Sequence, residues 1–278
     1  MNERSSSRSW NFQETQLYGL IGDPVQQSRS PQMHNAAYQA CGLDALYLPL
    51  RTLDLEQALL GMKALEPFQG ASVTHPFKQA ILPMLDKVDP VAEAIGSVNT
   101  VHKRGLALHG YNTDWLGARA ALSEALSGQT KPHFAVLGAG GCARAVVYAA
   151  LAVGGSVTVV NRSRKNGECL AGSFDTNFCP LDEITQLKAD CLFHTTPVGM
   201  PPLLEQSLVP LEALANFPIV IDAVYTPLET RLLREAKQRG CQTVSGVGMV
   251  IAQAAEQIRI WTGLDAPLDI MREAIDLK

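Results

Sequence analysis

Runs of apolar residues alternate along the chain with longer amphipathic stretches, and this pattern predicts short strands followed by helices. In the second half of the chain, the predicted strands are 134–137, 156–160, 191–194, 219–223 and 242–245. Strands that alternate with helices in this way form a parallel sheet covered by helices, with right-handed crossovers. The second half is therefore predicted to be one parallel, helix-covered α/β unit.

The first half shows a similar alternation, with a hairpin added. Apolar runs predict strands at 17–21, 45–50 and 70–74, and a hairpin of strands 98–102 and 106–110. Helical spacing predicts helices at 31–42, 53–65, 77–85 and 115–126, and two closing helices at 248–261 and 269–277. Lys78 would lie in the first turn of its helix, where a cation opposes the helix dipole. This locally unfavourable position indicates that Lys78 has another role.

A glycine-rich turn joins the first strand of the second unit to its helix. The strand 134–137 runs directly into Gly138, and Gly140 and Ala143 follow at the spacing of the dinucleotide-binding fingerprint. Gly138 permits a sharp turn, Gly140 lets the backbone approach a pyrophosphate, and Ala143 lets the helix pack close to the strand. The helix N-terminus offers free N–H groups to the phosphates. The turn therefore predicts a dinucleotide site.

The end of the next strand indicates which dinucleotide binds. NAD-binding sites usually carry a carboxylate about 20 residues past the glycine turn, where it accepts a hydrogen bond from the ribose 2′-hydroxyl. No acid directly follows the strand 156–160, because the segment 161–165 reads Asn-Arg-Ser-Arg-Lys. The planar guanidinium groups of Arg162 and Arg164 suit a 2′-phosphate. The segment therefore predicts NADP, and the alternative interpretation is a solvated basic loop.

Composition narrows the class of protein. The 278 residues suffice for two domains, and the formal net charge of -4 argues against a nucleic-acid surface. No apolar run reaches the roughly 18 residues of a membrane span. The polar residues 1–16 lack the apolar core of a signal peptide, and we predict a flexible tail there. The six cysteines are scattered without a C-x-x-C pair, which favours reduced thiols in a cytoplasmic enzyme over disulfides or a metal site.

Polar residues follow several predicted strands of the first unit, where ligands of open α/β sheets gather. They are Ser28, Ser30, Thr74, Lys78, Asn99 and Asp114. Reduction of a carbonyl creates an alkoxide, which needs a proton and positive charge nearby. A lysine beside a carboxylate supplies both, so Lys78 and Asp114 are candidate catalytic residues. Taken singly, each of these residues also fits ordinary capping or a surface charge.

Motifs spread over the chain between Tyr18 and Gly263 resemble those of the shikimate dehydrogenase family, which includes quinate dehydrogenases. They are G-D-P-V-Q-Q-S-R-S-P-Q-M-H-N at 22–35, S-V-T-H-P-F-K at 72–78, G-S-V-N-T at 96–100, N-T-D-W-L-G at 112–117, G-A-G-G-C-A at 138–143, N-R-S at 161–163, H-T-T-P-V-G-M at 194–200, D-A-V-Y-T-P at 222–227 and G-V-G-M-V-I-A-Q with W-T-G at 246–263. The resemblance implies two α/β domains, an N-terminal substrate-binding domain and a Rossmann-type NADP-binding domain, with a central cleft. It places the substrate-binding domain at 17–114 plus 249–278 and the NADP-binding domain at 115–248.

The resemblance also implies an activity, the reversible NADP-dependent reduction of 3-dehydroshikimate to shikimate. This reaction is a step toward aromatic amino acids. Two alternatives stay open. One is a quinate or aminoshikimate dehydrogenase of the same family, and the other is a non-catalytic NADP-binding sensor on the same fold. No partner other than the small-molecule substrate is expected, and the protein is expected to be a monomer or a homodimer.

The resemblance assigns roles to particular residues of this chain. Lys78 would transfer the proton at the C3 oxygen and Asp114 would orient it, while Ser28 and Ser30 would hold the substrate carboxylate. Further substrate contacts are expected from Ser72, Thr74, Asn99, Tyr225 and Gln253. The expected cofactor-binding residues are Gly138, Ala139, Gly140, Gly141, Cys142, Ala143, Asn161, Arg162, Ser163, Arg164, Lys165, Thr196, Val198, Ala223 and Gly246. No metal is expected.

Three positions depart from the family pattern. Ser72 replaces a usual Asn, so its side chain is shorter and offers one hydroxyl donor in place of an amide. Gln27 stands where His is usual, and His194 stands where Asn is common before Thr-Thr-Pro. Both serines of the substrate motif, Ser28 and Ser30, are kept, which favours shikimate as the substrate.

Overall fold

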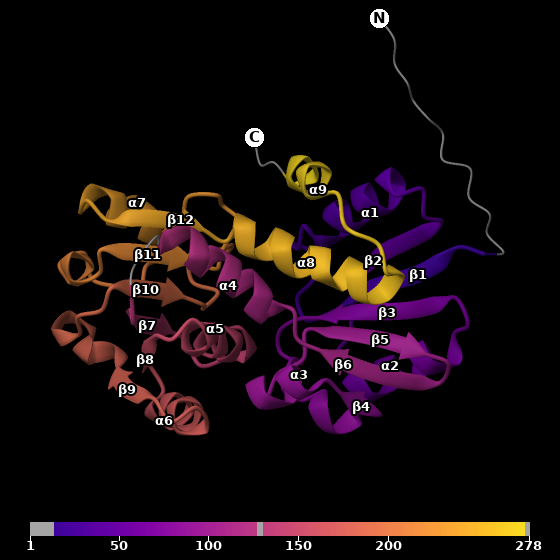
Figure 1. Ribbon diagram of the computed structural model, residues 1–278, viewed down its shortest axis with the longest axis horizontal. Helices are drawn as coiled ribbons and strands as arrows, with labels where there is room; N and C mark the ends of the chain where they lie inside the picture. The colour runs from indigo at the N-terminus through magenta and orange to yellow at the C-terminus, as the bar shows by residue number, and fades with distance from the viewer. Residues whose placement is uncertain (1–13, 127–129, 276–278) are drawn as a thin grey trace, which may run out of the picture.

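Two six-stranded sheets form the framework of the computed structural model, which describes residues 14–126 and 130–275 (Figure 1). The first sheet contains β1 (Gln16–Gly22), β2 (Ala45–Arg51), β3 (Phe68–Val73), β4 (Lys87–Val88), β5 (Thr100–Arg104) and β6 (Ala107–Tyr111), with helices α1 (Ser30–Ala40), α2 (Leu55–Ala64) and α3 (Pro90–Ile95) and the 3-10 turn η1 (Leu82–Met84). The second contains β7 (His133–Leu137), β8 (Ser156–Asn161), β9 (Asn177–Pro180), β10 (Cys191–His194), β11 (Ile219–Asp222) and β12 (Gln242–Ser245), with α5 (Gly141–Ala152), α6 (Arg164–Ser173), α7 (Arg231–Gln238), η2 (Leu181–Gln186) and η3 (Ala213–Asn216). Helices α4 (Asp114–Ala125), α8 (Val247–Thr262) and α9 (Leu268–Ala274) complete the chain.

The second sheet has the strand order β12-β11-β10-β7-β8-β9, and all its neighbouring strands are parallel. This is the order of the Rossmann dinucleotide-binding fold, read from the opposite edge. Apolar clusters cover both of its faces, which explains why its strands read as continuous apolar runs. Successive connections leave β7 and β10 in opposite directions, so the switch point where such sheets bind ligands lies between these two strands.

The first sheet is mixed, with the order β2-β1-β3-β5-β6-β4. Strands β1, β2 and β3 are parallel, and β5 and β6 form the predicted antiparallel hairpin. Since β1 and β3 lie side by side and point the same way, the loops that follow them emerge at one edge. Those two loops contain Ser28, Thr74 and Lys78, and Ser30 opens the helix α1 that follows the first of them.

Helices α4 and α8 run between the two sheets and pack against each other (Figure 1). Met249, near the start of α8, packs in the apolar cluster of the second sheet, together with α4 and α5. Further along the same helix, Ile251 and Trp261 pack in the cluster formed by α1, β1 and β2. The long C-terminal helix therefore returns the chain to the first sheet, so its polar side chains lie beside residues from the first half of the sequence.

Most predicted elements are present, and the differences have local causes. The helix predicted at 77–85 was wrong: turns and η1 occupy this segment. Pro83 has no N–H to donate to the carbonyl of Gln79, so an α-helix would lose a hydrogen bond at that point. Lys78 is consequently in a turn, and the helix-dipole argument does not apply to it. The short strands β4 and β9 were missed, since two and four residues carry almost no periodicity.

The two ends of the chain differ slightly from the prediction. Of the predicted tail 1–16, residues 1–13 lie outside the described residues, while Gln16 opens β1 and Thr15 Oγ1 donates a hydrogen bond to Asp44 Oδ1. The helix predicted at 269–277 spans Leu268–Ala274, and residues 276–278 lie outside the described residues. The domain boundaries at 114/115 and 248/249 stay a prediction. Among the described residues, no helix is long and apolar enough to cross a membrane.

Protonation of His34 is expected to destabilise the protein at mildly acidic pH. His34 is fully buried, stacks on Tyr47 with ring centroids 4.2 Å apart, and donates from Nδ1 to the carbonyl of Ser30. Burial lowers the pKa of His34 to about 4, whereas the unfolded chain titrates near 6.5. Between these values the unfolded chain binds more protons than the folded one, so the free energy of unfolding falls as the pH falls.

This one group should cost about 2 kcal/mol of unfolding free energy between pH 7 and pH 5. Urea unfolding at the two pH values measures the loss. A His34→Gln variant should show a pH dependence that is smaller by that amount. An identical pH dependence in the variant and the unaltered protein would contradict the assignment to His34.

Candidate functional site

The side chains of Lys78 and Asp114 form a hydrogen-bonded ion pair, with 2.5 Å between Nζ and Oδ2. Lys78 lies in the turns after β3, and Asp114 is the first residue of α4. Both side chains are largely buried, with 19% and 8% of their surface exposed. Burial alone would lower the pKa of Lys78, but the charge of Asp114 and its hydrogen bond outweigh burial and raise the pKa. Lys78 is therefore an ammonium at neutral pH.

Asn99 binds the other carboxylate oxygen of Asp114, the one that Lys78 does not contact. Its Nδ2 lies 2.8 Å from Asp114 Oδ1 and 3.2 Å from Oε1 of Gln253 on α8. Its Oδ1 accepts a hydrogen bond from the backbone N–H of Thr113 at 2.7 Å, which fixes the orientation of the amide. Two more predicted site residues, Asn99 and Gln253, thus converge on the Lys78–Asp114 pair.

Ser72 belongs to a buried polar network that the sequence analysis missed. Its Oγ accepts from the hydroxyl of Tyr47 at 2.7 Å and donates to Oε1 of Gln257 at 2.8 Å. The amide of Gln257 donates in turn to Thr100 Oγ1 and to the carbonyl of Asn99. Gln257 follows Gln253 by four residues on α8, so both amides lie on one helix face. That spacing was the available signal, whereas nothing local marks Tyr47.

Replacing Ser72 by Ala is expected to lower the free energy of unfolding by about 1–3 kcal/mol, because two buried polar groups lose their partner. Urea denaturation measures the difference. Ser173→Ala is a suitable control, since Ser173 is exposed on α6 and exposed substitutions usually change stability by less than about 0.5 kcal/mol. If Ser72→Ala were as stable as the control, Ser72 would not be part of a structural network.

The loop after β1 brings the two predicted carboxylate-binding serines together. Ser28 Oγ lies 3.1 Å from Ser30 Oγ and accepts a hydrogen bond from the backbone N–H of Ser30. Ser30 opens α1, whose N-terminus has no side-chain cap. The hydroxyl of Tyr225, which follows β11 in the second sheet, accepts from the backbone N–H of Arg29 at 3.4 Å. Tyr225 therefore joins the second sheet to this loop of the first.

The glycine turn after β7 has the geometry that its sequence predicts. Gly138 adopts a φ of 129°, which side-chain-bearing residues rarely adopt, and Ala143 is fully buried against the sheet. No side chain caps the N-terminus of α5 at Gly140, so its first N–H groups are free to bind phosphate.

Gly141 brings this turn directly against the Lys78–Asp114 pair. A Cβ placed on Gly141 would lie 2.8 Å from Lys78 Cβ and 2.7 Å from Ser97 Oγ. Neighbouring Cys142 is part of the same contact region, and burial raises the pKa of its thiol to about 12. The thiol is therefore neutral at physiological pH, and Lys78 keeps Asp114 as its charged partner.

The basic segment after β8 is exposed, and its two arginines differ. Arg164 Nη2 lies 3.2 Å from Oε1 of Glu183 in η2, so a carboxylate does reach this segment, from the neighbouring strand connection. Among the described residues, Arg162 makes no ion pair. The hydroxyl of Ser163 caps α6 by accepting from the backbone of Asn166, and the amide of Asn161 donates to the carbonyl of Ser163. Lys165 is exposed beside them.

The remaining predicted cofactor residues follow β10, β11 and β12, at the same edge of the sheet as the glycine turn. Thr196 Oγ1 accepts from the backbone N–H of Val198 at 3.3 Å. A Cβ on Gly246 would lie 2.3 Å from the carbonyl oxygen of Ala223, so these two backbones touch.

Thr74, the predicted substrate residue that follows β3 in the first sheet, packs against Gly22, and its N–H donates a hydrogen bond to a carbonyl near the end of β1. The structure thus gathers the predicted residues into two groups that meet at Lys78 and Gly141.

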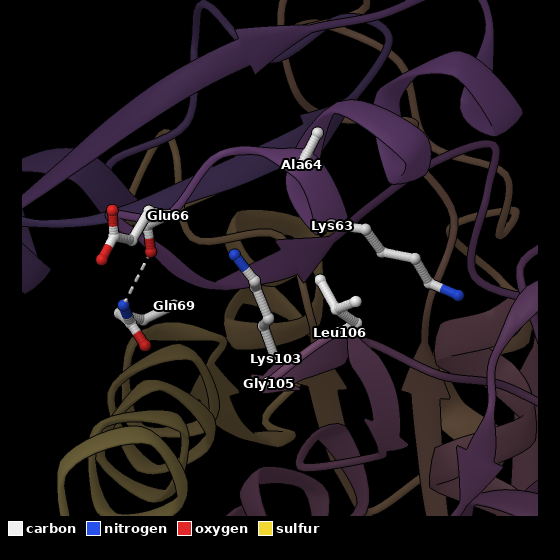
Figure 2. A pocket seen from close by; sticks show the side chains of 7 residues that line it. All are labelled: Lys63, Ala64, Glu66, Gln69, Lys103, Gly105 and Leu106. Atoms are coloured by element: carbon white, nitrogen blue, oxygen red, sulfur yellow. Dashed lines mark hydrogen bonds between the residues drawn. The ribbon is translucent and has the colours of Figure 1, made fainter.

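A surface hollow on the first sheet lies apart from these residues. It is lined by Lys63, Ala64, Glu66, Gln69, Lys103, Gly105 and Leu106 (Figure 2). Lys103 Nζ donates to the carbonyl of Leu65 at the end of α2, and Lys63 Nζ lies 2.8 Å from Asp86 Oδ2. Both lysines therefore have structural partners, and the hollow shares no residue with the predicted site.

Two family models match this chain, one in its N-terminal part and one near its C-terminus. The family model described as shikimate dehydrogenase substrate binding domain matches residues 20–101, and the one described as shikimate 5′-dehydrogenase C-terminal domain matches 246–275. The shikimate dehydrogenase (NADP(+)) of Moorella thermoacetica is 42% identical over 270 residues, which cover 92% of this chain and 91% of that protein.

Solved structures show the same similarity in three dimensions. The shikimate 5-dehydrogenase of Thermus thermophilus, in complex with NADP(H) and shikimate, is 36% identical with a TM-score of 0.83, covering 93% of this chain and 98% of that one. The quinate dehydrogenase of Corynebacterium glutamicum, in complex with NAD, is 33% identical with a TM-score of 0.85, covering 94% and 98%.

The similarity spans both sheets and both helices that join them, so it concerns the whole fold and not one domain. It confirms the predicted α/β fold with a Rossmann-type second unit. This chain belongs to the shikimate dehydrogenase family.

Proposed function

We propose that this protein catalyses the reversible NADP-dependent reduction of 3-dehydroshikimate to shikimate. The observation that carries the proposal is the contact between the Lys78–Asp114 pair and the glycine turn, where Gly141 leaves no room for a side chain beside Lys78. A proton-transferring pair and a dinucleotide-binding turn therefore adjoin. Reduction of a carbonyl needs both at one place.

The residues at the carboxyl edge of the second sheet fit NADP. The free N-terminus of α5 and the cradle at Gly138 suit a pyrophosphate, and Arg162 and Arg164 suit a 2′-phosphate. When bound, NADP supplies or accepts the hydride. The chain itself then has to orient the substrate and handle the proton.

Lys78 has the charge state that this task requires. In the direction of reduction, the C3 oxygen gains negative charge and then a proton. The ammonium of Lys78 stabilises the charge and is the proton donor, while Asp114 holds Nζ in place through its Oδ2. The amide of Asn99 in turn donates a hydrogen bond to Oδ1 of Asp114. The Lys78–Asp114 pair is therefore oriented before substrate binds.

The opposite end of the substrate is assigned to the loop after β1. The hydroxyls of Ser28 and Ser30, which lie at the N-terminus of α1 and its positive dipole end, form a site for the substrate carboxylate. Thr74, Tyr225 and Gln253 are assigned to the ring hydroxyls or the carboxylate. Ser72 contributes less directly than the family's usual Asn, because Tyr47 and Gln257 already engage its hydroxyl.

Initial rates with four substrate–cofactor pairs test the proposal. The nicotinamide absorbance band is followed with shikimate or quinate as the substrate and NADP or NAD as the cofactor. Shikimate with NADP should turn over fastest. Faster turnover of quinate would replace shikimate as the substrate, and no turnover with either polyol would support a binding protein without catalytic activity.

The proposal also assigns a cellular location, two domains and an oligomeric state. All six cysteines are free thiols, which suits a cytoplasmic location, where disulfides are rare. The substrate-binding domain is assigned to 17–114 plus 249–278, and the NADP-binding domain to 115–248. The active unit is assigned as a monomer or a homodimer, since each chain carries all the site residues named above.

A further inference from the structure

A buried histidine–carboxylate pair lies beside the nucleotide site and has no part in the mechanism above. His194 ends β10 and Asp222 ends β11, and the two residues are register partners in adjacent parallel strands. His194 Nδ1 lies 2.8 Å from Asp222 Oδ1, and only 2% and 0% of the two residues is exposed. His194 is also the position that departs from the Asn common in the family. The histidine–carboxylate pair is therefore a feature of this chain that the usual Asn of the family does not form.

The hydrogen bonds around Asp222 fix the tautomer of His194. Asp222 accepts from the backbone N–H of Val224 at 3.0 Å and from the hydroxyl of Thr230 at 2.6 Å. A carboxylate only accepts hydrogen bonds, so His194 Nδ1 is the protonated nitrogen that donates to it. In a neutral imidazole the other nitrogen, Nε2, is then an acceptor.

This tautomer determines what the hydroxyl of Thr196 can do. His194 Nε2 lies 2.5 Å from Thr196 Oγ1, and an accepting Nε2 receives a hydrogen bond that the hydroxyl of Thr196 donates. The same Oγ1 also accepts from the backbone N–H of Val198. A hydroxyl oxygen has two lone pairs, so Thr196 keeps one free acceptor site and no free donor.

Thr196 stands at the switch point of the Rossmann sheet. It follows β10, which neighbours β7, and its Cγ2 would lie 3.3 Å from a Cβ placed on Gly138. The preceding Thr195 bonds through its hydroxyl to the carbonyl of Leu137, the last residue of β7. The free acceptor of Thr196 is therefore beside the turn that a bound dinucleotide has to cross.

We propose that His194 is a positioning residue, held by Asp222, that makes Thr196 Oγ1 a hydrogen-bond acceptor for a donor on the nicotinamide half of NADP. The donor is an amide N–H or a hydroxyl, namely the carboxamide NH2 or a hydroxyl of the nicotinamide ribose. The inference rests on the proposed NADP-dependent function. It adds a residue that acts through Thr196 and does not touch the substrate.

Two substitutions of His194 separate its two hydrogen bonds. In His194→Asn the short amide can replace Nδ1 toward Asp222 but does not reach Thr196. In His194→Gln the longer amide can replace Nε2 toward Thr196 but gives up the bond to Asp222. The readout is the dissociation constant of NADPH, measured by nicotinamide fluorescence without substrate, together with the urea unfolding midpoint.

The expected result is a split between the two variants. His194→Asn should weaken NADPH binding about five- to tenfold, the usual worth of one hydrogen bond, with little change in the unfolding midpoint. His194→Gln should lower the midpoint and bind NADPH nearly normally. Binding of adenosine 2′,5′-bisphosphate, which lacks both the nicotinamide and its ribose, should be unchanged in both.

Further variants test the path through Thr196. Thr196→Val should weaken NADPH binding by the same factor, and adding His194→Asn to it should cause no further loss. His133→Asn is a matched control, because His133 also bonds a threonine in this sheet, Thr158, but at the opposite end of β7. The acetylpyridine analogue of NADPH, which lacks the carboxamide NH2, identifies the donor. If His194→Asn weakens binding of this analogue as much as binding of NADPH, the donor is a ribose hydroxyl. If it does not weaken binding of the analogue, the donor is the carboxamide NH2.

Unchanged NADPH binding in His194→Asn would overturn the inference. Equal weakening of NADPH and adenosine 2′,5′-bisphosphate would also overturn it, because His194 would then only stabilise the fold. The unaltered protein distinguishes these failures from failure of the proposed function: if it did not bind NADPH at all, the cofactor assignment itself would be wrong.

Discussion

Replacing Lys78 by Met is expected to lower kcat by about a thousandfold while changing KM by no more than about threefold. Methionine keeps the unbranched stem of the side chain as far as Cε and removes the ammonium group with its charge and its proton. The contact with the C3 oxygen is strongest when that oxygen is negatively charged, so the loss falls on the transition state and not on the bound substrate. Steady-state rates of shikimate oxidation with NADP measure both constants.

A matched control exists in the same half of the chain. Lys63 also pairs with a carboxylate, that of Asp86, at 2.8 Å, but it lines the surface hollow in Figure 2 and not the proposed site. Lys63→Met should leave kcat close to that of the unaltered protein. If Lys78→Met kept kcat and raised only KM, Lys78 would be a substrate-binding residue without a role in proton transfer.

Replacing Arg162 by Gln is expected to reduce the preference for NADPH over NADH by about ten- to a hundredfold, the range for a lost charge-assisted hydrogen bond to phosphate. Arg164→Gln should have a smaller effect, because Glu183 already shares the charge of Arg164. The measurement is the ratio of kcat/KM values for the two cofactors. The change should appear almost entirely with NADPH.

Arg239→Gln provides the control for this second prediction. Arg239 is an exposed cation that precedes β12, so it lies at the amino edge of the second sheet, away from the basic segment. Its loss should leave the cofactor ratio unchanged. Equal effects of Arg162→Gln and Arg239→Gln would mean that the preference reflects overall charge and not a local phosphate contact.

Short-range sequence patterns predicted the parts of the fold that depend on neighbouring residues. The strand before Gly138, its left-handed turn and the small residue at Ala143 all lie within ten positions, and the structure has them as predicted. The parallel second sheet followed from repeated apolar runs. No α-helix forms at 77–85, because the missing N–H of Pro83 outweighs the helical spacing of the apolar residues there.

Contacts between distant segments could not be predicted in the same way. Ser72 was recognised as a departure from its family, but its partners Tyr47 and Gln257 come from β2 and α8, far away in sequence. Glu183 reaches Arg164 only because β9 and its connection lie beside β8. Pairing of this kind depends on strand order, which a single sequence leaves open.

The most direct test of the central claim follows one hydrogen atom. Shikimate carrying deuterium at C3 is incubated with NADP, and the reduced cofactor is analysed by mass spectrometry. Our account predicts that the deuterium appears in NADPH, because the C3 position faces the cofactor while Lys78 handles the proton on the oxygen. Reduced cofactor without deuterium, or no reduction at all, would contradict it.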